Sequence, residues 1–221
     1  MAKHCRDLLA GRRVGKLLDA GGGSGALAAY VRRHLDPESI TVVDVDAAAL
    51  AETPAGMHTR LSRIEDLSDA DGRFDTILAR QVLHYVASAV DALTLLRKLL
   101  LPGGVIYVGQ IVAPDQSAAR WLAERASWAS PTRHSVFTTD ALLSLFAHAG
   151  LGLERAVIAP HWQRLKPTAQ AIGATTHAGD NGAMAMHAED DVIHVRVLWL
   201  HCLLVADETA RPGGMPRQAA V

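Results

Sequence analysis

The stretch Leu17-Leu18-Asp19-Ala20-Gly21-Gly22-Gly23-Ser24-Gly25 decides the fold of this chain. An apolar segment precedes its glycines and a helix-length segment follows them, so the glycines stand where a strand turns into a helix. Glycine lets the backbone turn sharply, and it lets a ligand approach the main-chain N–H groups because no Cβ is in the way. The stretch therefore favours a cofactor-binding turn over a flexible surface loop.

Segments of two kinds alternate outward from this turn. Apolar runs rich in Val, Ile and Leu are separated by helix-length segments, the pattern of parallel strands joined by crossover helices. We expect strands near residues 14–20, 40–44, 57–61, 74–79 and 105–110, and helices near 24–35, 46–52 and 88–100. A later helix (138–149) and two strands (153–159 and 192–205) follow, with long connections at 112–137 and 161–190 that are typical of lids, binding segments or disorder. The fold class is therefore α/β, with a doubly wound sheet.

Length and charge limit what the chain can be. Its 221 residues suit one domain, which we place at residues 1–210, with a disordered tail at 211–221. The formal net charge of -1 gives no general attraction to nucleic acid or to anionic membranes, so neither is an expected partner. The apolar run 192–206 is interrupted by charged residues and is too short for a membrane span.

Cysteine usage and the first residues favour a cytoplasmic protein. The two cysteines, Cys5 and Cys202, are far apart in the sequence and form no CxxC pair, which fits free thiols in a reducing compartment. The start of the chain has no apolar core of the kind that a signal peptide needs. The histidines show no HExxH pattern and no zinc spacing, so we expect no metal site.

Two acids discriminate between cofactors. Gly21, Gly23 and Ala26 also fit the dinucleotide pattern GxGxx(G/A), so the glycines alone leave a nicotinamide cofactor open. Asp19, at the end of its strand, would repel a pyrophosphate but attract the amino group and sulfonium of S-adenosylmethionine. Asp44 ends the second strand, where an acid can accept both hydroxyls of an adenosine ribose in either cofactor class. Asp19 therefore favours S-adenosylmethionine.

Four motifs resemble one family, the small class I S-adenosylmethionine-dependent methyltransferases often grouped as type 11 or UbiE-like. They are Leu-Asp-Ala-Gly-Gly-Gly-Ser-Gly (18–25), Val-Val-Asp-Val-Asp (42–46), Arg-Phe-Asp-Thr-Ile-Leu-Ala-Arg-Gln-Val-Leu-His-Tyr-Val (73–86) and Leu-Leu-Leu-Pro-Gly-Gly-Val-Ile-Tyr-Val (99–108). The motifs recur in order over roughly residues 14–160. The resemblance implies a Rossmann-like, mostly parallel seven-stranded sheet with an antiparallel last strand.

The resemblance also implies a set of cofactor contacts. The methionine end of S-adenosylmethionine would meet Asp19, the glycines and the main chain at Arg80 and Gln81, the ribose would meet Asp44, and the adenine would lie beside Ile64 and Glu65. The implied cofactor-binding residues are Asp19, Gly21, Gly23, Gly25, Asp44, Val45, Ile64, Glu65, Arg80 and Gln81. Arg63 departs from the family, which often has an acid there, and a backbone N–H near Glu65 could replace that contact.

His84 is the first candidate for a catalytic base. It follows the fourth expected strand, close to where the reactive methyl group should lie, and histidine titrates near neutral pH. A structural hydrogen bond is the alternative role for this residue, and methyl transfer often needs positioning alone. Tyr85, Gln110 and His161 also follow strands and are further candidates.

The function that these features favour is methyl transfer from S-adenosylmethionine, with S-adenosylhomocysteine as product, to a small organic acceptor. Enzymes that methylate an amino group in DNA, RNA or protein glutamine usually carry an (Asp/Asn)-Pro-Pro-(Tyr/Phe) motif after the fourth strand, and this chain has Ala79-Arg80-Gln81-Val82 there instead. Two alternatives stay open: an NAD(P)-dependent oxidoreductase, and a catalytically silent cofactor-binding subunit of a partner. Only about thirteen residues precede the first expected strand, so we expect the cover of the site to come from the long connections or from a second protomer in a homodimer.

Overall fold

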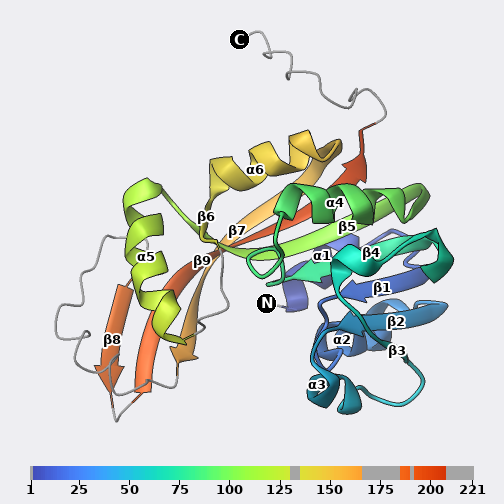
Figure 1. Cartoon of the computed structure of the whole chain (residues 1–221), viewed down its shortest axis with the longest axis horizontal. Coiled ribbons are helices and arrows are strands. Elements are labelled where there is room, and N and C mark those ends of the chain that lie inside the picture. The colour runs from blue at the N-terminus through green and yellow to red at the C-terminus, as the bar shows by residue number, and fades with distance from the viewer. Residues whose placement is uncertain (1, 130–134, 166–184, 190–191, 208–221) are drawn as a thin grey trace, which may run out of the picture.

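The computed structural model describes residues 2–129, 135–165, 185–189 and 192–207, and one sheet runs through them (Figure 1). Its main path has the order β3-β2-β1-β4-β5-β9-β7. The strands are β1 Lys16–Ala20, β2 Ser39–Asp44, β3 His58–Leu61, β4 Phe74–Arg80, β5 Leu100–Ala113, β6 Phe137–Thr138, β7 Leu151–Leu165, β8 Ala185–Glu189 and β9 Val192–Ala206. The α-helices are α1 Ala2–Leu9, α2 Ala26–Leu35, α3 Ala47–Ala51, α4 Ala89–Lys98, α5 Gln116–Ala129 and α6 Thr139–His148.

The strand directions confirm the predicted fold class. Strands β1 to β5 pair in parallel, and β9 is antiparallel to both β5 and β7. The strand count was incomplete, because β6 adds to β5 and β8 adds to β9, which makes a sheet of nine strands instead of seven. Strand β8 lies in the connection 161–190 and β6 lies where the connection 112–137 meets the predicted helix, and both are too short or too irregular in pattern to give a strand signal.

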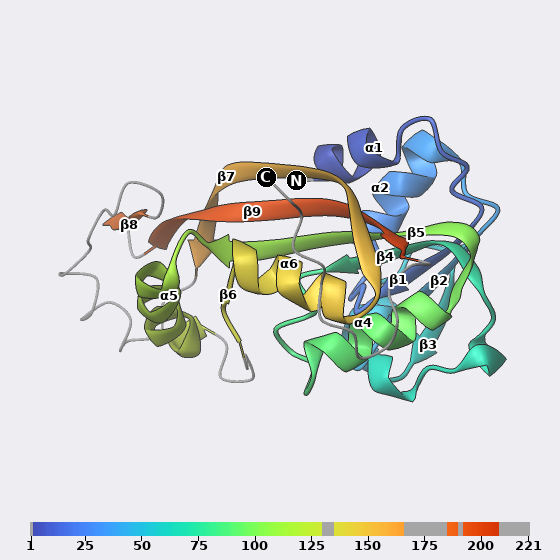
Figure 2. The ribbon, with the colours of Figure 1, turned by 90° about the horizontal axis from the view of Figure 1, so that it is seen from above.

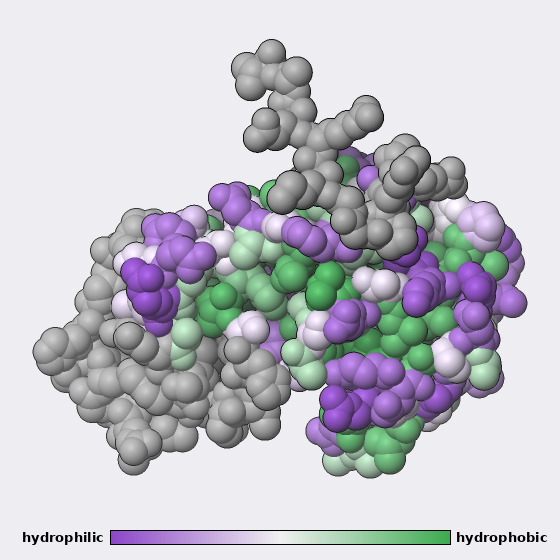
Figure 3. Space-filling view, turned by 45° about the horizontal axis from the view of Figure 1, so that its top comes forward, coloured by the Kyte–Doolittle hydropathy of each residue, from purple (hydrophilic) through white to green (hydrophobic). Residues whose placement is uncertain are grey.

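Helices cover both faces of the sheet, as Figure 2 shows from above. On one face, α1 and α2 pack over strand residues such as Leu17, Leu78 and Tyr107. On the other face, α4 and α6 pack over alternating positions such as Leu18, Ile77 and Val108. Figure 3 shows hydrophobic residues gathered in a band across the middle of the α4 and α6 side, with hydrophilic residues on its margins.

Several expected boundaries were wrong. The helix predicted from Ser24 begins at Ala26, and its N-cap is Gly25 at φ 70°, without a side-chain cap. The strand predicted from Val105 begins at Leu100, so Pro-Gly-Gly lies within β5 and does not separate it from α4. The caps of the other early helices are as expected, since Asp46 caps α3 and Ser88 caps α4.

The predicted loops also contain regular structure. Connection 112–137 holds α5, whose Ala118 and Leu122 pack against Ile111 and Trp199. Connection 161–190 begins inside β7 and includes β8, while the tail at 211–221 lies outside the described residues. The first residues form α1, which buries Cys5, Leu8 and Leu9. Among the helices of the described part of the chain, none is long and apolar enough to cross a membrane.

The strand order fixes where a ligand can bind. The chain builds β1-β2-β3 in one direction and then returns to place β4 on the other side of β1. In an open α/β sheet, the crossover helices leave a crevice at such a switch point, beyond the carboxyl ends of the strands. The glycine-rich turn after β1 and the segment after β4 therefore face the same crevice.

Candidate cofactor site

The glycine-rich turn is held by main-chain hydrogen bonds to its neighbours. The N–H groups of Gly21 and Gly22 donate to the Val43 carbonyl at 2.8 and 3.1 Å. A Cβ on Gly21, which has φ +67°, would lie 2.3 Å from Val82 Cγ2. A Cβ on Gly22 would lie 2.7 Å from Asp19 Cγ. The turn therefore passes so close to the segment after β4 and to Asp19 that only glycine fits.

Asp19 is a buried carboxylate at the end of β1. Its side chain is 2% exposed, and Oδ2 accepts a hydrogen bond from the Ala28 N–H at 3.3 Å. Burial raises the pKa of Asp19 to about 6, although the positive charge of Arg80 and the Ala28 N–H oppose the rise. A buried acid in this state gains from a cationic partner, such as a ligand ammonium group.

Asp44 is partly buried at the end of β2, and both of its oxygens accept hydrogen bonds. Oδ2 accepts from the Gly23 N–H at 2.7 Å, and Oδ1 accepts from the Asp46 N–H at 3.0 Å. Asp46 has a different role, because it accepts from Ala48 and Ala49 at the start of α3. The geometry thus ties Asp44 to the glycine-rich turn and leaves helix capping to Asp46.

A cavity of about 630 Å³ opens at the switch point. Six of the predicted cofactor-binding residues line it: Gly21, Asp44, Val45, Ile64, Glu65 and Gln81. The lining does not include Asp19, Gly23, Gly25 or Arg80, nor the candidate base His84. Tyr85, a further candidate from the sequence, also lines the cavity, whereas the sequence interpretation missed the lining residues Val43, Asp46, Ser62, Val82 and Val86.

One wall of the cavity is apolar and another is charged. Val45 is 66% exposed on the wall, an unusual state for Val that offers a flat apolar contact. Arg63 Nη2 lies 3.1 Å from Glu65 Oε1, which also accepts from the Ala87 N–H at 3.3 Å. Burial acts to raise the pKa of Glu65, but the bonds from Arg63 and from backbone N–H groups outweigh it and hold the pKa low. Glu65 therefore stays ionised beside the cavity.

Gln81 turns the chain out of β4 in a left-handed conformation. Its φ is 55°, and its N–H donates to the Gly109 carbonyl at 2.8 Å. Its side-chain Nε2 is buried and has no hydrogen-bond partner among the residues that the structure describes. A strained backbone and an unpaired buried donor on a cavity wall are features of ligand sites. No sequence signal marks the strain, because glutamine is not a usual left-handed residue.

His84 lies behind the cavity wall. Its side chain is 2% exposed, and Nδ1 is 3.0 Å from Nε2 of the fully buried Gln110. Tyr85, by contrast, is 44% exposed and lines the cavity. His161 is on edge strand β7, where burial lowers its pKa, away from the cavity-lining residues. The role of His84 as a base stays a prediction.

The residues present fit S-adenosylmethionine. The glycines at 21 and 22 let the turn pack against Val82 and Asp19 at the cavity, and the orphaned Gln81 amide offers a donor. Asp19 suits an ammonium group, Asp44 suits a ribose, and Val45 and Ile64 suit a flat base. Within the described residues, no three His, Cys, Asp or Glu side chains are arranged to hold a metal ion.

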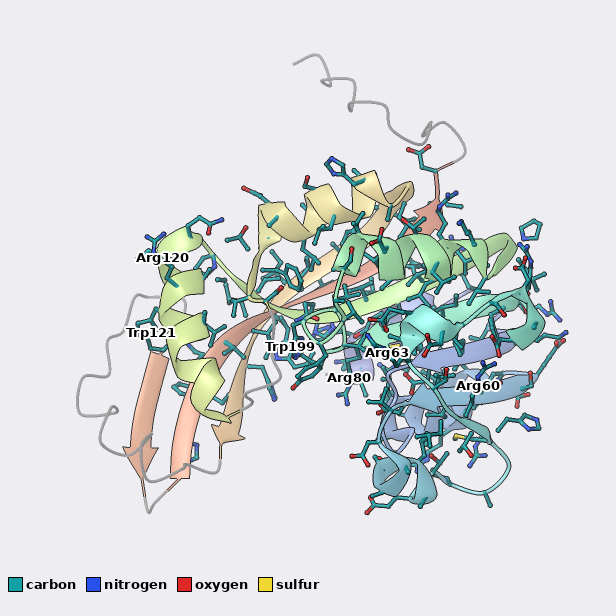
Figure 4. All side chains as sticks on the ribbon, viewed as in Figure 1. Arg60, Arg63, Arg80, Arg120, Trp121 and Trp199 are labelled. Atoms are coloured by element: carbon teal, nitrogen blue, oxygen red, sulfur yellow. The ribbon has the colours of Figure 1, made fainter. Side chains whose placement is uncertain are left out.

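Figure 4 labels side chains from both sides of the molecule and so shows where the cofactor site lies in it. Arg63 and Arg80 fall near its middle, and Trp199 of β9 falls beside them in this view. Arg120 and Trp121 lie on α5, on the opposite side of Trp199 from Arg60. The cofactor side of the molecule is thus the β1-β2-β3 side, and α5 with the ends of β5 and β9 forms the other side.

Comparisons with known proteins agree with this geometry. The profile of a family described as "Methyltransferase domain" matches residues 1–156. The malonyl-[acyl-carrier protein] O-methyltransferase of Enterobacter lignolyticus is 31% identical over 183 residues, which are 81% of this chain and 69% of that protein. The ubiquinone biosynthesis O-methyltransferase of Cereibacter sphaeroides is 30% identical over 151 residues, or 62% of this chain. The aligned region spans about 60% of the length of that relative.

A solved structure shares the fold. The YcgJ protein of Bacillus subtilis superposes with a TM-score of 0.78 at 14% identity, and the match covers 94% of this chain and 98% of that one. The likeness concerns the fold alone. Together with the family profile and the curated relatives, the cavity at the switch point shows that this chain belongs to the class I S-adenosylmethionine-dependent methyltransferases.

Proposed function

We propose that this enzyme transfers the methyl group of S-adenosylmethionine to an oxygen atom of a small organic acceptor. The observation that carries the proposal is the switch-point cavity, which has Asp44 on its wall and the buried Asp19 behind the glycine-rich turn. Two relatives at 30% identity or more are named as O-methyltransferases, which favours oxygen as the methylated atom. The net charge of -1 favours a small acceptor over a nucleic acid.

The residues of the chain would divide the cofactor among them. Asp19 would attract the ammonium group, Asp44 would accept from the ribose hydroxyls, and Val45, Ile64 and Glu65 would surround the adenine. When bound, S-adenosylmethionine supplies an electrophilic methyl group on a sulfonium. The chain needs to align an acceptor oxygen behind that methyl group and to exclude water, because an in-line displacement depends mainly on geometry. Gln81 and Tyr85, on the segment after β4, are placed to contribute to this alignment.

The cofactor assignment is tested by calorimetric titration with S-adenosylmethionine and, separately, with NADH. We expect binding of S-adenosylmethionine alone, weakened by about 1–3 kcal/mol in Asp44→Ala, because hydrogen bonds to a charged group are lost. Asp69→Ala is the matched control, since Asp69 is a carboxylate that pairs with Arg73 away from the cavity. Binding of NADH alone would favour an oxidoreductase instead.

The acceptor class is tested with S-adenosylmethionine that carries a tritiated methyl group. We expect label to enter small phenols or carboxylic acids and to be absent from RNA, DNA and protein fractions. Label found only in a macromolecule would refute the small acceptor, and label on amines alone would refute oxygen. Cofactor binding without transfer to any fraction would favour a silent subunit, which co-purification with a partner would then support.

A cytoplasmic location and a homodimer belong to the same proposal. Cys5 and Cys202 are both free and buried, which suits a reducing compartment. A second copy of the chain could complete the cover of the acceptor site. Sedimentation of the purified protein with and without S-adenosylhomocysteine would report such an assembly.

A further inference from the structure

Two buried polar side chains join the segment after β4 to the neighbouring strand. Gln110 of β5 is 0% exposed and His84 is 2% exposed, and Gln110 Nε2 lies 3.0 Å from His84 Nδ1. The N–H of Gln81 donates to the Gly109 carbonyl one residue earlier on β5. The segment from 81 to 86 is therefore tied to β5 at two points, and four of its residues line the cofactor cavity.

The Gln110 amide, oriented with Nε2 toward His84, indicates which imidazole nitrogen carries the proton. An amide nitrogen can only donate, so in this orientation Nδ1 of His84 accepts and the neutral ring keeps its proton on Nε2. An imidazole in this tautomer has no lone pair left at Nε2 to take a proton from an acceptor. The geometry therefore disfavours general-base catalysis by His84.

Tyr85 is the aromatic residue of this segment that reaches the cavity. Its ring lies 4.0 Å from the His84 ring at 45°, and its N–H donates to the Val82 carbonyl at 2.9 Å. The side chain is 44% exposed and lines the cavity, which His84 does not. The fixed imidazole thus forms a surface against which the phenol ring packs.

We propose that His84 is a positioning residue. Gln110 fixes the His84 ring, and this ring holds Tyr85 at the cavity. The phenol of Tyr85, and not the imidazole of His84, then faces the bound cofactor and acceptor. The inference rests on the proposed binding of the cofactor in this cavity. It deepens that proposal, because it assigns the aromatic residue on the reacting side. It is independent of which acceptor is methylated.

The tautomer is read directly by nitrogen NMR of the full chain labelled with ¹⁵N-histidine, with the His84 signals assigned by their loss in His84→Asn. We expect a protonated-type shift at Nε2 and an unprotonated-type shift at Nδ1. In Gln110→Glu the carboxylate can only accept, so the proton is expected to move to Nδ1. A wild-type ring protonated on Nδ1 would overturn the proposal, whether or not either variant folds.

The place of Tyr85 is read by fluorine NMR of protein labelled with 3-fluorotyrosine. The chain has three tyrosines, and they differ in surroundings: Tyr30 stacks on His34, Tyr107 bonds to His201, and Tyr85 packs on His84. Saturation with S-adenosylhomocysteine should shift the Tyr85 signal more than the other two. A shift confined to the other tyrosines would overturn the assignment, whereas failure of S-adenosylhomocysteine to bind would refute the cofactor proposal itself.

A matched pair of variants tests the positioning role. Gln110→Leu removes the donor to His84 with little change in volume, and we expect the Tyr85 fluorine signal to shift or broaden and the affinity for S-adenosylhomocysteine to fall several-fold. The control is Thr76→Val on β4, which removes a buried hydroxyl without a hydrogen-bond partner in the described part of the chain and should leave that signal unchanged. An unchanged Tyr85 signal in Gln110→Leu would show that His84 does not position it.

Discussion

Asp19 combines a cost in stability with a gain in binding. Asp19 is 2% exposed, and within the described residues its carboxylate receives a single hydrogen bond, from the Ala28 N–H. Burial raises its pKa to about 6, and the charge of Arg80 opposes only part of this rise. An ionised buried acid lowers the stability of the ligand-free protein, but it increases the attraction for a cationic ligand group. We therefore expect binding and stability to respond in opposite directions at this position.

The sign of the pH dependence follows from the raised pKa. Between the ordinary pKa of 3.8 and about 6, the folded protein binds a proton at Asp19 that the unfolded chain does not. This stabilisation is present at the acid end of the window and is lost as the pH rises through about 6. Asp19→Asn lacks this pH-dependent stabilisation. The unfolding free energy of the variant minus that of wild type should therefore rise by on the order of 2–3 kcal/mol from pH 4 to pH 8.

Urea unfolding of both proteins at pH 4, 6 and 8 measures this difference. The Asn variant should at the same time bind S-adenosylmethionine more weakly at pH 8. A difference in unfolding free energy that does not vary with pH would mean that Asp19 is ionised throughout.

Gln81 is a second residue whose environment selects the conformation. Its φ of 55° favours Gly, Asn or Asp over a β-branched side chain. We expect Gln81→Val to lower the free energy of unfolding by about 1–3 kcal/mol, while Gln81→Asn stays close to wild type. Thermal unfolding of the two variants checks this, and equal stability would contradict the strain argument.

Among the elements, α1 is one of those that the sequence pattern did not predict. Its eight residues bury Cys5, Leu8 and Leu9 against α2 and the sheet. A helix this short is not stable by itself, so tertiary packing must hold it. Leu9→Ala removes a fully buried side chain and should cost about 2–5 kcal/mol of unfolding free energy.

Lys3→Ala, at an exposed position of the same helix, is the control and should change the unfolding free energy by less than about 0.5 kcal/mol. Equilibrium unfolding of both variants in urea makes the comparison. A small effect of Leu9→Ala would show that α1 contributes little to the folded state.

The elements that the sequence did predict share a local signal. The strands β1, β2 and β4 are short apolar runs, and Asp46 and Ser88 are recognisable caps that bond as expected. The elements that it missed depend on packing between elements. Helix α5 packs through Ala118 and Leu122 on Ile111 and on the distant Trp199. Strand β8 pairs with the neighbouring strand β9, but its sequence Ala-Met-His-Ala-Glu has no β-branched residue and no strand pattern of its own. A local pattern therefore does not reveal these elements.

The same distinction explains the site at the scale of the whole molecule. Six cavity residues followed from motifs, because the ends of parallel strands must meet at one edge. The strain at Gln81 and the burial of His84 under Gln110 depend on how β4 lies beside β5. Motif order therefore predicts where the cofactor binds, and strand packing decides which side chains face it.

The reactivity of the two thiols is a probe of local and global unfolding. Cys5 in α1 and Cys202 in β9 are both 0% exposed, and they belong to different core clusters. Burial raises the pKa of Cys202 to about 12, and burial together with the charge of Asp19 raises the pKa of Cys5 beyond its ordinary range. Since the thiolate is the reactive form, neither group should react with a disulfide reagent in the folded state.

Each cysteine is then labelled only when the structure around it opens. The cysteine that is labelled first distinguishes detachment of α1 alone from unfolding of the whole sheet. If α1 detaches while the sheet stays folded, Cys5 reacts before Cys202, as local openings cost less than global unfolding. We expect this order, because α1 is a single short helix whereas β9 is paired on both sides along most of its length. Peptide mass spectrometry after timed labelling gives the two rates, and Leu9→Ala should increase the rate at Cys5 more than that at Cys202. Equal rates at both cysteines in both proteins would mean that α1 and the sheet unfold as one cooperative unit.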